Sequence, residues 1–204
     1  VTANGKVRKN SLLDFENIQQ SGKIAMKLED NDTIVGIKIL DDDDDFLLSS
    51  KNGKALRVQS KKLRLFKGRS SKGIKGMSLK KDDKIISLSI LKSVKITSDE
   101  AKSYIKASRL EKDLDETPED DNEKTKIIKL SNKQIQEFKN KEQYILTVTE
   151  NGYGKRSSAY EYRVSGRGGQ GIINIISSER NGSVASTFTI NHEDQIMLIT
   201  DKGQ

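Results

Sequence analysis

The sequence predicts an all-β fold: part of a β-propeller with four-stranded blades of about 50 residues each. The first observation behind this prediction is a motif in which an apolar strand, a turn with a central glycine and a cation-bearing strand follow one another. Copies occupy residues 1–9, 46–57, 145–156 and, cut short, 196–203. The second observation is the spacing, since the turn glycines Gly5 and Gly53 lie 48 residues apart. Such a period in a β-rich chain is typical of propeller blades.

Each repeat continues with two further predicted strands. Glycine-led strands are expected at 22–28, 73–79 and 171–176, and after a polar turn a last strand is expected at 33–40, 84–91 and 183–190. The last strands are rich in β-branched residues, which favour a buried sheet. The one proline, Pro118, lies outside every predicted strand, as its missing N–H requires. About four strands per repeat match the strand count of a blade.

We expect residues 1–204 to form a single propeller fragment that carries an insertion. The predicted units are a first blade at 1–45, a second at 46–94, an insertion at 95–142, a third blade at 143–194 and the start of another at 195–204. Within the insertion we predict a helix over 98–114 with Ser98 as its N-cap, a short helix over 131–138, and disorder across 113–121. Because both ends interrupt a repeat, we expect a piece of a longer protein.

Composition narrows the class of protein. The absence of cysteine excludes disulfides and thiolate metal sites. No apolar run reaches the length of a membrane span and no leader peptide is recognisable, so we expect a cytoplasmic setting. The net charge is +7, but residues 95–142 contribute −1, so the repeats carry +8. Such a field attracts polyanions, with nucleic acid the commonest partner, although an ordinary lysine-rich surface is the plain alternative.

A glycine-rich loop at 165–171 is the strongest functional candidate. Its four glycines leave bare backbone around Arg167, and such backbone can approach a phosphate closely. The loop at 67–76 occupies the same place in the second repeat and is also basic. Alternatively, these glycines only satisfy turn geometry. A Walker A loop is excluded because no Gly-Lys-Ser/Thr follows at the required spacing.

The second candidate is the cation-dense stretch 57–75, in which Leu63, Leu65 and Phe66 are expected to anchor the chain. This density suits a surface that follows a nucleic-acid backbone, and a solvated connecting strand is the alternative. Its basic residues are Arg57, Lys61, Lys62, Arg64, Lys67, Arg69, Lys72 and Lys75.

Other candidates for chemistry are weaker. The run Asp41–Asp45 is expected to be a hairpin tip, because consecutive carboxylates without spacing or a turn glycine do not build a defined metal cage. Tyr153 is expected to pack or stack, and His192 to lie in a surface turn. Since no nucleophile triad, zinc site or carboxylate dyad can be assembled, we expect no catalysis, no metal and no cofactor in this chain.

Taken together, these motifs resemble the C-terminal domain of the A subunit of bacterial DNA gyrase. The resemblance covers about residues 1–94 and 143–204. It is carried by Thr2–Gly5 with the cations that follow, by Gly68-Arg69 with Gly73–Gly76, and by Thr149–Arg156 with Glu161-Tyr162-Arg163. The topoisomerase IV A subunit shares the fold of that family but is less similar.

This resemblance implies a β-pinwheel, a six-bladed propeller variant whose blades exchange strands and whose basic rim bends double-stranded DNA. It further implies that ATP, Mg²⁺, the B subunit of gyrase and the rest of the A subunit act elsewhere in a bacterial, nucleoid-associated enzyme that introduces negative supercoils. The family's heptad Gln-Arg-Arg-Gly-Gly-Lys-Gly is absent. Residues 165–171 match it at Arg167, Gly168, Gly169 and Gly171, and Gln170 replaces its lysine.

We therefore expect a non-catalytic module that binds and bends DNA without sequence preference. The alternatives are a topoisomerase IV C-terminal domain, a propeller that docks an acidic protein, or an enzyme with a site in the channel. The residues predicted to contact DNA are Lys6, Arg8, Lys9, Arg57, Lys61, Lys62, Arg64, Arg69, Lys72, Lys75, Lys155, Arg156, Arg163, Arg167, Gly168 and Gly169.

Overall fold

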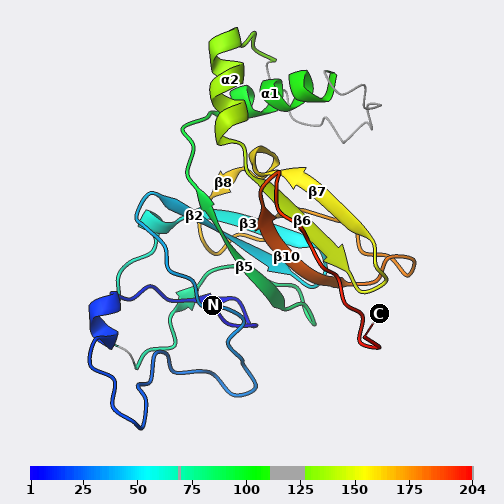
Figure 1. Cartoon of the computed structure of the whole chain (residues 1–204). Helices are drawn as coiled ribbons and strands as arrows, with labels where there is room; N and C mark the ends of the chain where they lie inside the picture. Colours follow the sequence, from blue (N-terminus) through cyan, green and yellow to red (C-terminus); the bar gives the residue numbers. More distant parts are fainter. Residues whose placement is uncertain (69, 111–126, 204) are drawn as a thin grey trace.

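The structure, a computed structural model, describes residues 1–68, 70–110 and 127–203 (Figure 1). The strands are β1 (Lys6–Val7), β2 (Asp44–Ser50), β3 (Lys54–Gln59), β4 (Ile74–Lys75), β5 (Ile85–Lys92), β6 (Tyr144–Thr149), β7 (Gly154–Ser158), β8 (Val164–Ser165), β9 (Ile172–Ile173) and β10 (Val184–Ile190). The helices are α1 (Ser98–Leu110) and α2 (Asn132–Lys141), with the 3₁₀ turns η1 (Leu12–Phe15), η2 (Ser60–Lys62) and η3 (Ala159–Glu161). Within the described residues no helix has the length and apolarity needed to cross a membrane.

Two copies of the repeated motif form antiparallel hairpins, as predicted. In the second repeat β2 pairs with β3 across a turn at Gly53, and in the third β6 pairs with β7 across a turn at Gly152. Both glycines have φ of 80°, a conformation that costs other residues strain. The last strand of each of these repeats, β5 or β10, pairs with the other edge of β2 or β6. In the second repeat β2 therefore lies between β3 and β5, and in the third repeat β6 lies between β7 and β10.

Successive repeats exchange strands. The glycine-led strand of the second repeat, β4, pairs with β1 of the first repeat. In the same way, β8 and β9 of the third repeat both pair with β3 of the second, β8 in parallel and β9 antiparallel. The central sheet therefore holds strands from two repeats, as the resemblance to a pinwheel implies.

The core lies between the sheets. Every residue of β2 is buried, and its successive side chains face opposite ways. Phe46 and Leu48 belong to a cluster with Val7 of the first repeat, whereas Leu47 packs in a second cluster with Ile145 of the third. The two faces of this one strand therefore hold the neighbouring repeats together.

Three predicted strands do not form. Residues 22–28 and 196–200 contain no strand, and 33–40 makes only an isolated bridge between Ile34 and Thr2. β5 and β10 each have a long strand of their own repeat beside them. Backbone hydrogen bonds join residues 33–36 to residues 1–3, and this pairing goes no further along the described segment. Without backbone partners, the β-branched side chains Ile37 and Ile39 stay exposed.

The insertion forms two capped helices. α1 begins at Ser98, but its cap is Thr97 rather than Ser98, because Thr97 Oγ1 accepts from the Glu100 N–H at 3.2 Å. α2 is longer than the predicted 131–138, and Ser131 with Gln134 forms a capping box. The end of the helix predicted at 98–114 and the disorder predicted across 113–121 lie outside the described residues.

Candidate nucleic-acid interface

The two glycine-rich loops lie against each other. The N–H of Gly168 donates to the Gly76 carbonyl at 2.5 Å, and Ser78 donates through its N–H to Gly169 O and through Oγ to Gly168 O, both at 2.8 Å. We call residues 68–76 and 165–171 the loop pair; Arg69 lies outside the described residues. The sequence predicted equivalent places in two repeats, and the strand exchange brings these places into contact.

The glycines of the loop pair have two different roles. Gly73 and Gly171 have φ of 77° and 73°, and a Cβ on either would collide with the carbonyl oxygen of Val7 or Ala55, respectively. These two glycines are required for the exchanged strands to dock. Gly68 and Gly166 have no atom within 4 Å of a built Cβ. At these two positions the glycine instead leaves backbone open to an incoming group.

Cations gather around the loop pair. Lys6 on β1 lies opposite Lys75 on β4, and a guanidinium nitrogen of Arg167 lies 3.5 Å from the Lys75 carbonyl. Arg8 donates to both the carbonyl and the hydroxyl of Ser71. We call Lys6, Arg8, Lys72, Lys75 and Arg167 the basic junction. It combines cations from three repeats in a small area, as phosphate contacts require.

Neighbouring groups position three of these cations, Lys6, Arg8 and Lys72. The Arg8 and Arg64 guanidinium carbons lie 4.9 and 4.4 Å from the centre of the Phe66 ring, which is buried, so Phe66 does anchor this segment. Glu29 lies 3.7 Å from Lys6 and 3.8 Å from Lys72. Lys75 and Arg167 are exposed and are the cations of the junction best placed to meet an external anion.

Arg57 was predicted to contact DNA from the surface, but its side chain is buried, so this prediction is wrong. Arg57 is 5% exposed; its Nε donates to Asp45 at 2.8 Å and its Nη1 to the Ala159 carbonyl at 2.8 Å. The third repeat covers this position, so the guanidinium links β2, β3 and η3 inside the molecule. At the equivalent position of the third repeat, Arg156 is exposed and lies over the ring of Tyr144.

The other predicted cations are spread over the three repeats. Lys9 forms an ion pair with Asp42, while Lys61 and Lys62 are exposed on η2. The Lys155 ammonium lies 3.9 Å from a carboxylate oxygen of Glu161. Arg163, two residues after Glu161, is exposed. Lys155 and Arg156 on β7 and Arg163 after η3 therefore flank η3 in the chain, and we call these three cations the basic area around η3. Gly168 and Gly169 belong to the loop pair itself.

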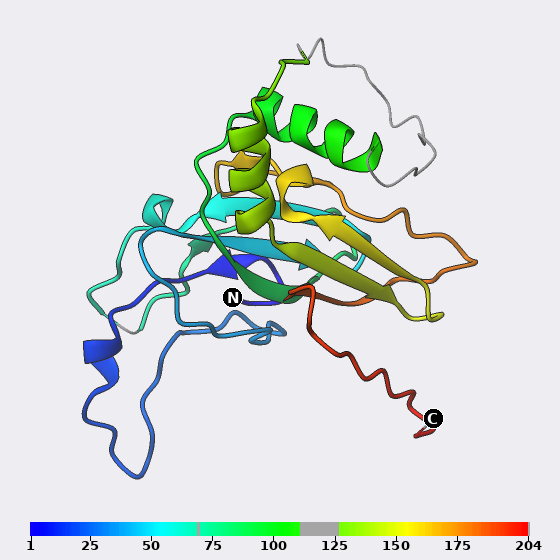
Figure 2. The ribbon, with the colours of Figure 1, turned by 45° about the horizontal axis from the view of Figure 1, so that its top comes forward.

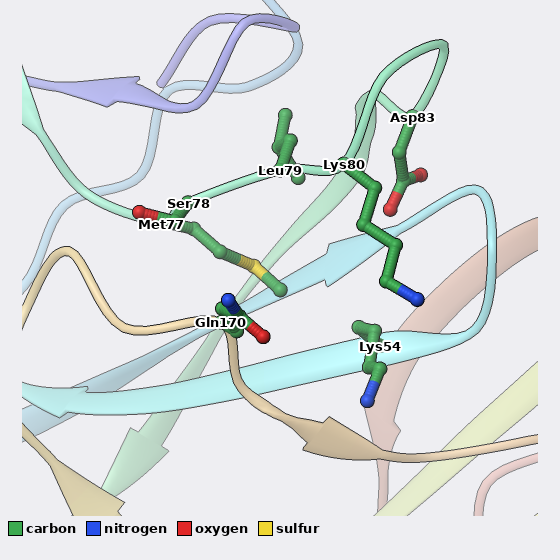
Figure 3. A pocket seen from close by; sticks show the side chains of 7 residues that line it. All are labelled: Lys54, Met77, Ser78, Leu79, Lys80, Asp83 and Gln170. Carbon is green, nitrogen blue, oxygen red and sulfur yellow. The ribbon is translucent and has the colours of Figure 1, made fainter.

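The hollow beside the loop pair is too small for a ligand. It measures about 30 Å³, roughly the volume of one water. Figure 3 shows Met77 pointing toward Gln170, with the other lining residues Lys54 and Lys80 on separate segments. Among the described residues, no group of three or more His, Asp or Glu side chains is placed to hold a metal ion. The geometry suits surface contact with an extended polyanion.

Sequence reasoning missed how the insertion attaches. Tyr104 of α1, Phe138 of α2 and Tyr160 of η3 pack edge to face, with ring centres 5.5–6.2 Å apart. Glu142 accepts hydrogen bonds from the Tyr104 hydroxyl at 2.9 Å and the Tyr144 hydroxyl at 2.7 Å. The tyrosines were visible in the sequence, but nothing there connected positions this far apart.

Comparison with known proteins places the chain in a family. The family model described as the DNA gyrase C-terminal domain, a beta-propeller, matches residues 1–41, 44–92 and 143–191. The DNA gyrase A subunit of Rickettsia bellii is 43% identical over 204 residues, which are 100% of this chain and 22% of that protein. The DNA gyrase A subunit of Escherichia coli K12 is 31% identical over 202 residues, 99% of this chain and 18% of that protein.

The fold also matches a solved structure. The crystal structure of the C-terminal domain of DNA topoisomerase IV aligns with a TM-score of 0.70 and 20% identity, over 100% of this chain and 49% of that one. The chain spans about a fifth of the length of the curated relatives it matches. Because the family model matches well over half of the residues, the chain belongs to the DNA gyrase C-terminal domain family.

Proposed function

We propose that this chain binds and bends double-stranded DNA without sequence preference, as a non-catalytic module of a bacterial gyrase. The observation that carries the proposal is the loop pair, where open glycine backbone and the exposed cations Lys75 and Arg167 lie together. Cations and backbone N–H groups bind phosphate oxygens, which are the same at every base pair. A surface of this kind therefore holds DNA without reading its sequence.

The arrangement of the sheets favours a curved path. The basic junction belongs to the first two repeats and the Gly168 loop, whereas Lys155, Arg156 and Arg163 flank η3 of the third. A duplex that touches both areas follows a surface made by successive blades. Bending it costs a few kcal/mol in elastic estimates, which extra phosphate contacts along the bend offset.

In the whole protein we propose that this module presents bent DNA to the enzyme's cleavage core and so supports ATP-dependent negative supercoiling. The relatives, which are A subunits of DNA gyrase, support this role. ATP, Mg²⁺ and the chemistry of cleavage would then belong to the rest of the A subunit and to the gyrase B subunit, in the bacterial cytoplasm at the nucleoid.

The test is binding to a random duplex of about 40 base pairs across a salt series, with end-to-end FRET to report bending. We expect affinity to fall steeply with salt and the duplex ends to approach each other. The variant Lys75→Gln/Arg167→Gln should reduce the magnitude of the salt slope by about two. The control Lys81→Gln/Lys84→Gln removes equal charge from two exposed lysines in the turn that precedes β5.

Each outcome decides a different part of the proposal. Binding with no approach of the ends would overturn bending but support DNA binding. No binding at low salt would overturn the proposal and favour a propeller that docks an acidic protein. Equal effects of the variant and the control would remove the loop pair from the interface.

A further inference from the structure

Helix α1 presents a stripe of cations. Lys102, Lys106 and Arg109 are spaced i, i+4 and i+7, which places them on one side of the helix. Ala101 and Tyr104 are buried on a different side, against α2 and η3. Lys102 and Lys106 are exposed. We call Lys102, Lys106 and Arg109 the α1 stripe.

The α1 stripe is held in a fixed position on the third repeat. Besides the packing of Tyr104, Phe138 and Tyr160, the Tyr160 hydroxyl donates to the Phe138 carbonyl at 3.0 Å. Both views of the molecule place the two helices together over the end of the sheets where β7 finishes and β8 begins (Figures 1 and 2). The insertion is therefore a docked part of the surface rather than a separate appendage.

The stripe also meets the basic area around η3. Glu161 of η3 lies 3.7 Å from Arg109 of α1 and 3.9 Å from Lys155 of β7. One carboxylate is thus shared by the last cation of the stripe and the first cation of the third repeat. Arg109 of α1 therefore lies next to the basic area around η3, on the other side of the Glu161 carboxylate.

The charge of the described insertion agrees with this proximity. Residues 95–110 and 127–142 hold eight basic and four acidic side chains, and the other eight acidic residues of the insertion fall within 111–126. Three of the four carboxylates are engaged locally: Glu100 by Thr97, Glu137 by Lys141 and Glu142 by two tyrosines. The described part of the insertion, residues 95–110 and 127–142, therefore carries a net charge of +4, whereas residues 111–126 carry −5 and the insertion as a whole carries −1. The positive charge that could attract a polyanion is thus confined to the described part.

We propose that the α1 stripe is a second DNA contact, which extends the phosphate-binding path of the third repeat onto the insertion. This inference rests on the proposed function. From Lys102 to Arg109 the helix rises roughly 10 Å, and phosphates along one strand advance about 3.4 Å each, so the stripe spans about three phosphates. DNA is the occupant that proximity to the basic area around η3 favours over an acidic protein.

The experiment compares three forms of the chain on the same 40-base-pair duplex across a salt series. Lys102→Gln/Lys106→Gln should lower the magnitude of the salt slope by about two, whereas Lys81→Gln/Lys84→Gln should leave it unchanged. Far-ultraviolet circular dichroism checks that α1 is retained. Both substituted lysines are exposed, and glutamine has about the same helix propensity as lysine, so α1 should be retained.

The outcomes separate this inference from the function on which it rests. If the unsubstituted chain does not bind DNA, the proposed function fails. If it binds and the stripe variant keeps the full salt slope, only the inference is overturned, and an acidic protein becomes the better occupant of the stripe. An equal loss in the stripe and control variants would indicate a net-charge effect and would also overturn the inference.

Discussion

At the scale of single residues, the exchanged strands dock because a large side chain on one strand faces a small residue on the other. A Cβ on Gly76 would collide with the Val7 side chain, so the larger Val7 is accommodated by a glycine. In the next repeat the smaller Ala55 stands in the place of Val7, and Asn174 replaces the glycine. Asn174 uses its side chain to accept from the Tyr162 hydroxyl and to donate to Thr147. The same pair of positions between repeats is thus occupied by Val7 and Gly76 in one place and by Ala55 and Asn174 in the other.

Gly171 should be required for folding and Gly166 should not. Gly171 has φ of 73°, and a Cβ would also strike the Ala55 carbonyl, so Gly171→Ala should destabilise the chain by about 1–3 kcal/mol. Gly166→Ala meets no atom within 4 Å and should change stability by less than about 1 kcal/mol. Urea unfolding of both variants measures the difference. Equal effects would mean that the glycines of this loop share one role.

Arg57 should contribute to stability and not to DNA affinity. Arg57→Gln leaves the buried Asp45 carboxylate without its partner, a loss that typically costs about 3–5 kcal/mol. The salt slope of DNA binding should stay unchanged at temperatures where the variant is folded. Arg156→Gln is the matched control, since the equivalent cation is exposed and its loss should cost little stability. A reduced slope with normal stability in Arg57→Gln would contradict the buried position.

At the scale of elements, the sequence predicts what local chemistry decides. The turns at Gly53 and Gly152, the strands β5 and β10 and the presence of α2 follow from residues close together in the chain. Local sequence does not show how far a neighbouring backbone extends, so the strand predicted at 33–40 reduces to an isolated bridge and hydrogen bonds over residues 33–36. The sequence also predicts Arg57 as a surface cation, because no residue near Arg57 in the chain indicates that η3 covers it.

The docking of the insertion should be lost at alkaline pH. Burial, followed by the Glu142 carboxylate, raises the pKa of Tyr144 and of Tyr160 from 10.0 to about 12. Because the folded state binds these protons more tightly, stability is constant below about pH 10 and falls as the pH rises toward 12. Tyrosinate absorbance and helical circular dichroism, followed together against pH, should show this transition.

Glu142→Gln tests the cause of that alkaline transition. Without the carboxylate, the pKa of Tyr144 should fall toward its ordinary value, and the transition should move to lower pH. The neutral amide can still accept a hydrogen bond, so the packing of the insertion below pH 10 should be retained. Superimposable titrations of the two proteins would leave burial as the sole cause.

At the scale of the whole molecule, β2 should be the most protected element in hydrogen exchange. It is paired on both edges, with β3 and β5, and covered on both faces by clusters shared with the first and third repeats. Its amides can then exchange only when the molecule unfolds globally, so their protection should equal the free energy of unfolding from urea. Residues 22–40 have few backbone partners and should exchange through local opening. If the β2 amides exchanged with a free energy well below that of urea unfolding, the sheet around β2 would open separately rather than with the whole molecule.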